Sequence, residues 1–170
     1  GGSLEIRMRF ALETSAAMRA AWPKDKPMGV RVSATDWVEG GWTADETVVL
    51  AKELKALGCD YIDASTGALD PRQKIPLSAG YQVPFAEKIR KEADIPTMAV
   101  GLIVAARPAE DILAPRKADF VVLARGAVGG PRFAWASAEE LGGEAQYAPR
   151  TMPCHPSLRP WLFTNRQKAG

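Results

Sequence analysis

The stretches LGCDYIDAS (residues 57–65) and RKADFVVLA (residues 116–124) decide the fold class. Each contains the end of an expected helix, followed by an aspartate, an aromatic residue and an apolar run. Nearly every residue of the two runs is apolar, which is typical of parallel strands that helices cover on both faces. A unit that occurs twice in this form predicts a chain in which strands and helices alternate.

The remainder of the chain divides in the same way. An opening helix is expected after Ser3, which would act as its N-cap, with an apolar face of Leu4, Met8, Ala11 and Leu12. Four strands are expected at residues 27–34, 60–65, 96–103 and 118–126. Four further helices are expected at residues 43–58, 84–93, 107–117 and 132–142.

The helix expected at 43–58 has the clearest signals at its ends. Thr43 and Glu46 form a capping-box pattern, and Gly58 provides a left-handed stop. The predicted buried face consists of Val49, Leu50, Leu54 and Leu57.

Alternating strands and helices predict a parallel sheet, and two architectures remain open. An open doubly wound sheet of the dinucleotide-binding type requires a G-x-G-x-x-G motif after an early strand, and the sequence has none. A (βα)8 barrel requires polar residues at the carboxyl ends of several strands. Such residues are present: Arg31, Ser33, Asp63, Ser65, Gly101 and Arg125.

Gly101 and Arg125 follow the third and fourth expected strands. In (βα)8 barrels a phosphate commonly binds at the loops after the last two strands. Glycine lets backbone N–H groups approach an anion, and the guanidinium fork of arginine matches phosphate oxygens. A simple turn at Gly101 and a salt bridge at Arg125 are the alternatives. Together the two residues favour a phosphorylated cofactor.

Arg31 interrupts the otherwise apolar or small strand sequence GVRVS (residues 29–33). A charge inside a buried strand is costly unless it is paired. Two interpretations stay open: an ion pair with Asp63 on the neighbouring strand, or a cation directed into the mouth of a barrel.

The composition excludes several classes of protein. The 170 residues fit one domain, and a net charge of +2 gives no indication of a nucleic-acid partner. No apolar run is long enough to span a membrane. Cys59 and Cys154 are too few for a disulfide framework, so a reducing, cytoplasmic location is expected. The single histidine, His155, is expected in a loop, and no cluster has metal-ligand spacing.

Several segments together resemble the old yellow enzyme family, most closely its thermophilic-like branch of FMN-dependent ene-reductases. The resemblance covers residues 1–141 and implies the C-terminal half of a (βα)8 TIM barrel, from helix 4 through strand 8 and helix 8. Residues 142–170 would form an irregular tail. The segments are GGSLEIRMRF (1–10), GVRVSATDWVEGGW (29–42), YIDASTGAL (61–69), GYQVPFAEKIRKEADIPTMAVGLI (80–103) and ADFVVLARG (118–126).

The resemblance implies roles for individual residues. Arg31 matches the arginine that reaches the pyrimidine edge of the flavin, while Gly101, Ala124 and Arg125 match positions that bind the FMN phosphate. In such enzymes hydride passes from NADPH or NADH to flavin N5 and then to the β-carbon of an activated alkene. Arg150, in QYAPR, lies one residue later than a family arginine that enters the neighbouring subunit of a homo-oligomer.

The chain also departs from the family pattern. Ile6, Ala124 and Gly130 replace an asparagine, a glycine and an aspartate, and the Ala124 methyl is expected to crowd the phosphate. The residues that bind the substrate carbonyl and donate the proton belong to the first half of the barrel, so no catalytic residue can be named here. The alternative is therefore an inactive half-barrel with residual FMN or phosphate binding. A phosphosugar isomerase or aldolase is less favoured, because no lysine or glutamate stands at a strand end.

Overall fold

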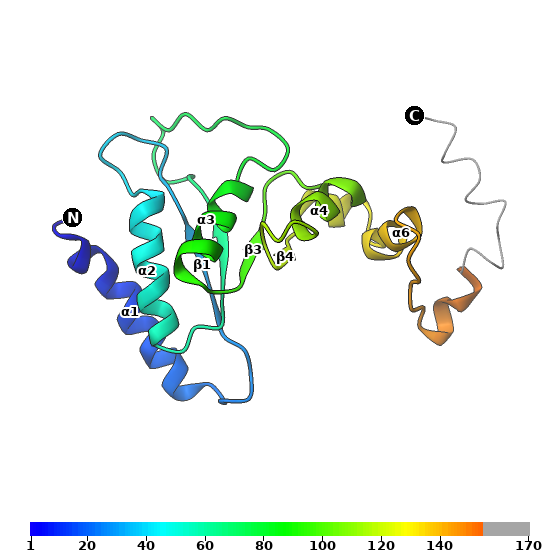
Figure 1. Cartoon of the computed structure of the whole chain (residues 1–170), viewed down its shortest axis with the longest axis horizontal. Coiled ribbons are helices and arrows are strands. Elements are labelled where there is room, and N and C mark those ends of the chain that lie inside the picture. The colour runs from blue at the N-terminus through cyan, green and yellow to red at the C-terminus, as the bar shows by residue number, and fades with distance from the viewer. Residues whose placement is uncertain (155–170) are drawn as a thin grey trace.

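The computed structural model describes residues 1–154, in which helices and strands alternate as the sequence predicts (Figure 1). The strands are β1 (Gly29–Ser33), β2 (Tyr61–Ser65), β3 (Thr97–Ala99) and β4 (Phe120–Val121). The helices are α1 (Leu4–Ala21), α2 (Ala44–Ala56), α3 (Val83–Ala93), α4 (Ala106–Leu113), α5 (Arg125–Gly129) and α6 (Phe133–Glu140), followed by a 3-10 helix, η1 (Pro149–Cys154).

The four strands form one parallel sheet in the order β1-β2-β3-β4, which confirms the predicted parallel arrangement. Each strand therefore pairs with the strand that follows it in the chain. The register aligns Arg31 of β1 with Asp63 of β2, and Asp63 with Met98 of β3. These three residues form one row across the sheet, and this row carries the charged side chains.

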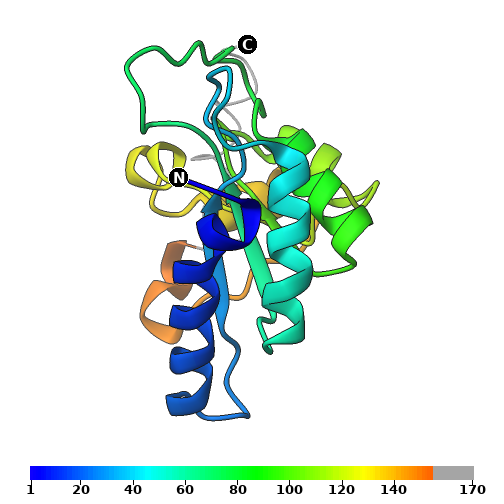
Figure 2. The same cartoon turned by 90° about the vertical axis from the view of Figure 1, so that its left-hand side faces the viewer.

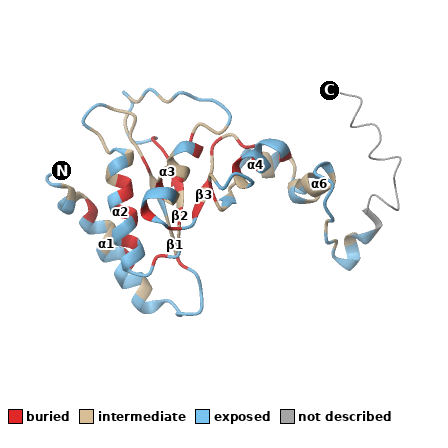
Figure 3. Cartoon of the chain, viewed as in Figure 1, coloured by how far each residue is buried: buried red, intermediate tan, exposed pale blue. Residues whose placement is uncertain are grey.

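The core lies between the sheet and the helices that cover it. Figure 2 shows α2 and α3 side by side, and Figure 3 shows buried residues concentrated on these helices and on β2 and β3. Leu54 of α2, Ile62 of β2 and Ile89 of α3 are almost completely buried. Contacts between these large apolar side chains fix the helices on the sheet.

The second face of the sheet has no such cover in the described part of the chain. Along β2, Ile62 and Ala64 are buried, whereas Tyr61, Asp63 and Ser65 on the other face are only half-buried. The prediction that helices cover the strands on both faces is therefore wrong for the residues described.

Helix α2 confirms both of its predicted ends but not its predicted face. The Thr43–Glu46 capping box is complete, and Gly58 has a φ of +87°. Val49 and Leu57 are exposed, contrary to the prediction. Val49 lies about half a turn from the centre of the buried side of α2, and Leu57 lies at the C-cap, beyond the last helical residue.

The opening helix and the later strands also differ in detail from the predictions. Ser3 is the N-cap of α1, but its side chain does not cap the helix. Its hydroxyl bonds to Glu5 instead, which lowers the pKa of that carboxyl. The strand expected at 96–103 ends at Ala99, and the strand expected at 118–126 is reduced to Phe120–Val121. The chain turns away at Gly101 in the first case and enters α5 in the second.

Candidate functional site

Three of the predicted cofactor residues line one cleft beyond the carboxyl ends of β3 and β4. The cleft has a volume of about 100 Å³, and its walls include Gly101, Ala124 and Arg125. Gln82, which directly precedes α3, lines it as well. The fold thus brings Gly101 next to Ala124 and Arg125, although they are 23 and 24 positions apart in sequence, because the carboxyl ends of parallel strands share one edge of the sheet.

Gly101 gives this cleft a wall made of backbone. Its φ is +123°, a conformation that side-chain-bearing residues rarely adopt. A Cβ at this position would lie 3.1 Å from Nε2 of Gln82. Residue 101 therefore meets both the backbone and the packing requirements of glycine; it is buried, and its C=O accepts a hydrogen bond of 2.8 Å from the N–H of Gly80.

Arg125 and Ala124 also line the cleft. Both residues are exposed, and Arg125 is the first residue of α5. Within residues 1–154 the Arg125 side chain makes no ion pair or hydrogen bond, so its five N–H donors are available to a ligand.

Arg31 lies outside this cleft and differs from its prediction in two ways. It is the third of the five residues of β1, not a residue at the strand end. Its side chain is 55% exposed, so it does not lie within a buried strand environment. Its Nη1 donates to Oδ2 of Asp63 at 2.6 Å, which is the ion pair that the sequence left as one of two interpretations.

A chain of hydrogen bonds connects Arg31 to the cleft. Nη2 of Arg31 donates to the Ser65 hydroxyl at 3.2 Å, and this hydroxyl donates to Oε1 of Gln82 at 3.3 Å. The same oxygen accepts a hydrogen bond of 2.9 Å from Thr66. The charged row of the sheet and the cleft therefore belong to one polar network on the side of the sheet without helices.

Sequence reasoning missed Gln82 and Thr66, which are both buried and polar. The only signal was a single glutamine between Tyr81 and Val83 at the start of an amphipathic helix. The sequence is equally compatible with an exposed glutamine at that position, so the burial of Gln82 could be recognised only from the structure.

Two observations test whether these residues fit a phosphorylated flavin. The first is the backbone wall at Gly101 together with the free guanidinium of Arg125, which match a phosphate group. The second is Oδ1 of Asp63, which is buried and has no hydrogen-bond partner in the described residues. It lies on the same face as Arg31, where a ring with N–H groups would satisfy it. The residues therefore fit FMN.

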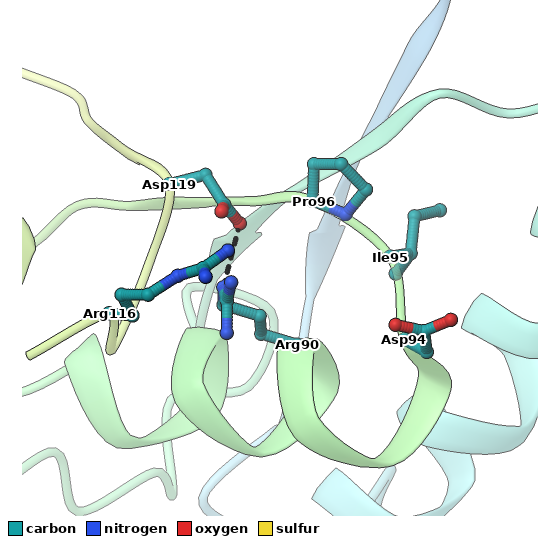
Figure 4. A pocket seen from close by; sticks show the side chains of 6 residues that line it. All are labelled: Arg90, Asp94, Ile95, Pro96, Arg116 and Asp119. Atoms are coloured by element: carbon teal, nitrogen blue, oxygen red, sulfur yellow. Dashed lines mark hydrogen bonds and ion pairs between the residues drawn. The ribbon is translucent and has the colours of Figure 1, made fainter.

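A second hollow, of about 220 Å³, lies at the opposite edge of the sheet (Figure 4). Figure 4 shows the guanidinium groups of Arg90 and Arg116 turned toward the carboxylate of Asp119. Asp119 accepts hydrogen bonds of 3.0 Å from Nε of Arg90 and from the backbone N–H of Thr97. Burial alone would raise the pKa of Asp119, but these two donors outweigh it and hold the pKa below its ordinary value. Through Arg90 and Thr97, the carboxylate of Asp119 connects α3 to β3.

The other predicted site residues have mixed outcomes. Arg150 is exposed in η1, and nothing in the structure tests its predicted role between subunits. His155 lies outside the described residues. Cys59 is buried, and burial raises the pKa of its thiol.

No group of metal-ligating side chains gathers in residues 1–154. Over the same residues, no helix has the length and apolar character needed to cross a bilayer.

A parallel sheet with a cleft at the carboxyl edge of its last two strands is the arrangement in which α/β proteins commonly bind their ligands. Comparison with known sequences identifies the chain further. A model of the NADH:flavin oxidoreductase / NADH oxidase family matches residues 1–142, and the chain belongs to this family. The resemblance to old yellow enzymes is therefore confirmed.

Curated relatives carry the name NADPH dehydrogenase. The protein of Geobacillus sp. (strain WCH70) is 49% identical over 142 residues, which cover 84% of this chain and 41% of the relative. The protein of Halalkalibacterium halodurans is 44% identical over 151 residues, which cover 86% of this chain and 44% of the relative. The chain thus spans less than half the length of these relatives.

Solved structures confirm the relationship at the level of the fold. A 2-naphthoyl-CoA reductase complex matches with a TM-score of 0.72 and 26% identity, over 84% of this chain and 22% of that one. Morphinone reductase matches with a TM-score of 0.61 and 24% identity, over 89% of this chain and 39% of that one. These neighbours are TIM-barrel enzymes, and this chain matches a part of each.

Proposed function

We propose that this chain is the C-terminal half of a (βα)8-barrel oxidoreductase that uses FMN and NADPH, with NADH as the alternative donor, to reduce an activated alkene. The observation that carries the proposal is the cleft that brings Gly101, Ala124 and Arg125 together beyond the last two strands. The family match to residues 1–142 supports the flavin, and the relatives' name supports NADPH. A cytoplasmic, homo-oligomeric protein is part of the same proposal.

Each of the predicted residues has a distinct task in this proposal. The backbone at Gly101 and the guanidinium of Arg125 hold the phosphate, while the exposed methyl of Ala124 narrows the cleft. Arg31 stabilises negative charge at the pyrimidine edge of the ring, in a position fixed by Asp63. When bound, FMN supplies the hydride-transfer chemistry.

The second candidate is a half-barrel that binds FMN or phosphate without turnover. The observation in its favour is the sheet face without helices, where Asp63 and Ser65 are half-buried. The groups that orient a substrate and donate a proton must lie within hydrogen-bond reach of it. Among the side chains described on this face, no two combine a group that orients the substrate with a group that donates a proton.

Flavin binding by the 170-residue chain tests the proposal. We expect quenching of FMN fluorescence on titration with the chain, weakened about tenfold in Arg125→Met because a charge-assisted hydrogen bond to phosphate is lost. Arg107→Met is the matched control, because Arg107 is also exposed but does not line the cleft. Equal losses in both variants, or no FMN binding by the unchanged chain, would contradict the proposal.

Turnover distinguishes the two candidates. Anaerobic oxidation of NADPH with cyclohexenone should be undetectable with this chain alone, even with FMN added, because orientation and proton transfer each contribute several powers of ten. Adding a first barrel half from a relative as a separate chain should restore activity. Clear turnover by the 170-residue chain alone would show that it carries its own proton donor.

A further inference from the structure

The hollow of about 220 Å³ beyond the amino ends of β3 and β4 carries an excess of positive charge. The residues that line it are Arg90, Asp94, Ile95, Pro96, Arg116 and Asp119. Asp94 is 98% exposed, and its Oδ2 lies 2.9 Å from Nζ of Lys55, which does not line the hollow. Because the charge of Asp94 is compensated by Lys55, the two guanidinium groups of the hollow face a single carboxylate, that of Asp119.

The carboxylate of Asp119 uses only part of the hydrogen-bonding capacity of Arg90. Its Oδ2 accepts hydrogen bonds of 3.0 Å from Nε of Arg90 and from the backbone N–H of Thr97. Within residues 1–154 the side chain of Arg90 makes no other hydrogen bond, although it is only 20% exposed. The Nη groups of a largely buried guanidinium are therefore available to a ligand.

Arg116 has even fewer partners. Its charge contributes to the lowered pKa of Asp119, but its side chain makes no hydrogen bond and no ion pair in the part of the chain that the structure describes. Figure 4 shows its guanidinium turned into the hollow, toward the same carboxylate that Arg90 contacts. Two positive charges around one carboxylate leave one positive charge unbalanced, and an anion from outside the chain would compensate it.

The backbone at Arg116 is also unusual for its residue type. Its φ is +59°, in the left-handed region that favours glycine or asparagine over longer side chains. Non-glycine residues in this region occur preferentially at binding sites, where the side chain has a task that outweighs the strain. No contact of the Arg116 side chain within residues 1–154 supplies such a task, so a ligand in the hollow is the candidate.

From these observations we propose that the hollow is an anion site, which binds the phosphate group of a small molecule between the Nη groups of Arg90 and the guanidinium of Arg116. The forks of two arginines match the several oxygens of a phosphate, and its two negative charges exceed the one unbalanced positive charge. Ile95 and Pro96 provide an apolar wall for the remainder of the ligand. The inference is independent of the proposed function, because the site lies at the other edge of the sheet from Arg125 and involves no flavin.

Titration of the 15N-labelled chain with inorganic phosphate tests the proposal, with sodium chloride exchanged to keep the ionic strength constant. The Nε–Hε resonances of Arg90 and Arg116 should shift and saturate with phosphate, and they should not shift with chloride alone. Arg125→Met should leave these shifts unchanged, since Arg125 lines only the other cleft. Absence of a saturating shift at both arginines, or the same shifts with chloride, would overturn the proposal.

A substitution adds a second measurement. Arg116→Gln removes the charge and leaves the backbone requirement of the position as it is. We expect about tenfold weaker phosphate binding, followed on the resonance of Arg90, because charge-assisted hydrogen bonds are lost. Arg107→Gln is the matched control, since Arg107 is exposed but does not line the hollow, and its affinity should equal that of the unchanged chain. Equal weakening in both variants would show that phosphate responds only to net charge, and would overturn the site.

Discussion

Gly101 meets two requirements at once, because its backbone is in the left-handed half of conformational space and its missing side chain makes room for Gln82. We expect Gly101→Ala to lower the free energy of unfolding by about 1–3 kcal/mol, through backbone strain and the displacement of Gln82. Urea denaturation measures this loss. Gly40→Ala is the control, since Gly40 has a φ of +73° but nothing within 4 Å of a Cβ. An equal loss in both variants would show that Gln82 adds nothing.

Asp119 makes stability dependent on pH. Its pKa is depressed in the folded chain, so its contribution is present above the ordinary value of 3.8 and is lost as the pH falls through the depressed value. We expect Asp119→Asn to lose about 1 kcal/mol at pH 7, with the difference from the unchanged chain shrinking toward pH 3. Thermal unfolding at several pH values tests this.

The control for Asp119 is an aspartate without a partner. Asp111 is exposed and makes no ion pair within the described residues, so Asp111→Asn should leave the unfolding curve unchanged at pH 7. A pH-independent loss in Asp119→Asn would contradict the role of its charge.

Single residues were predictable where one local rule applied. Gly101 follows a strand, and glycine there indicates a turn or a ligand contact without any knowledge of its neighbours. The pairing of Arg31 with Asp63 remained open, because it depends on the register between two strands 32 residues apart. Gln82 could not be identified at all. It is buried because the end of β2, the start of α3 and the turn at Gly101 come together only in the folded chain.

At the scale of elements, the capping box fixes where α2 begins. The Thr43 hydroxyl accepts from the N–H of Glu46, and Glu46 accepts from the N–H of Thr43. The same carboxylate pairs with Arg7 of α1, and this pairing is the main reason that the pKa of Glu46 is lowered. The beginning of α2 is thus also the point at which two helices are joined.

We expect Thr43→Ala to destabilise the chain by about 1 kcal/mol, because the N–H of Glu46 loses its acceptor. Chemical denaturation followed by circular dichroism measures the change. Thr14→Ala, on the exposed side of α1, should be neutral or slightly stabilising, since alanine is the better residue inside a helix. A loss of similar size at position 14 would contradict the capping explanation.

Helix ends were predictable from the sequence, but the last strands were not. Capping and stop signals act within four residues, so the bounds of α2 followed from local chemistry. The strands β3 and β4 are shorter than their apolar runs, because the chain leaves the sheet at Gly101 and at α5. An apolar run shows that residues are buried, but not whether they pair with a neighbouring strand.

For the whole molecule, the uncovered apolar surface predicts association. Phe10 is 82% exposed and Ile6, one turn earlier on α1, is 55% exposed. Exposed apolar patches and unpaired strand edges favour contacts between chains. We expect sedimentation velocity to show concentration-dependent association, weakened about tenfold in Phe10→Ser because a large apolar side chain is removed from the contact.

The matched control is Arg9→Ser on the neighbouring, charged position of the same helix. Arg9 is 70% exposed and, among residues 1–154, makes only a 3.9 Å pair with Glu13, so its loss should leave association unchanged. A monomer at all concentrations would argue against an incomplete barrel.

The alternation of strands and helices was predictable over the part of the chain that the structure describes, because it follows from repeated local patterns. The coverage of the two faces of the sheet was not predictable. A strand that is apolar on both faces requires packing partners on both, and the sequence does not show which elements supply them. Tyr61, Asp63 and Ser65, which share one face of β2, are only half-buried, so within residues 1–154 this face lacks the helix cover that the sequence predicted.

The sequential strand order also has a kinetic consequence. Since β1 pairs with β2, β2 with β3 and β3 with β4, each new strand docks on an edge that already exists, and each closure spans a loop of similar length. The sheet can therefore grow in the order in which a ribosome releases the chain, without waiting for a distant segment. Until the next strand emerges, the newest strand is an open edge, and this is the stage at which a nascent chain is most exposed to aggregation and most dependent on chaperones.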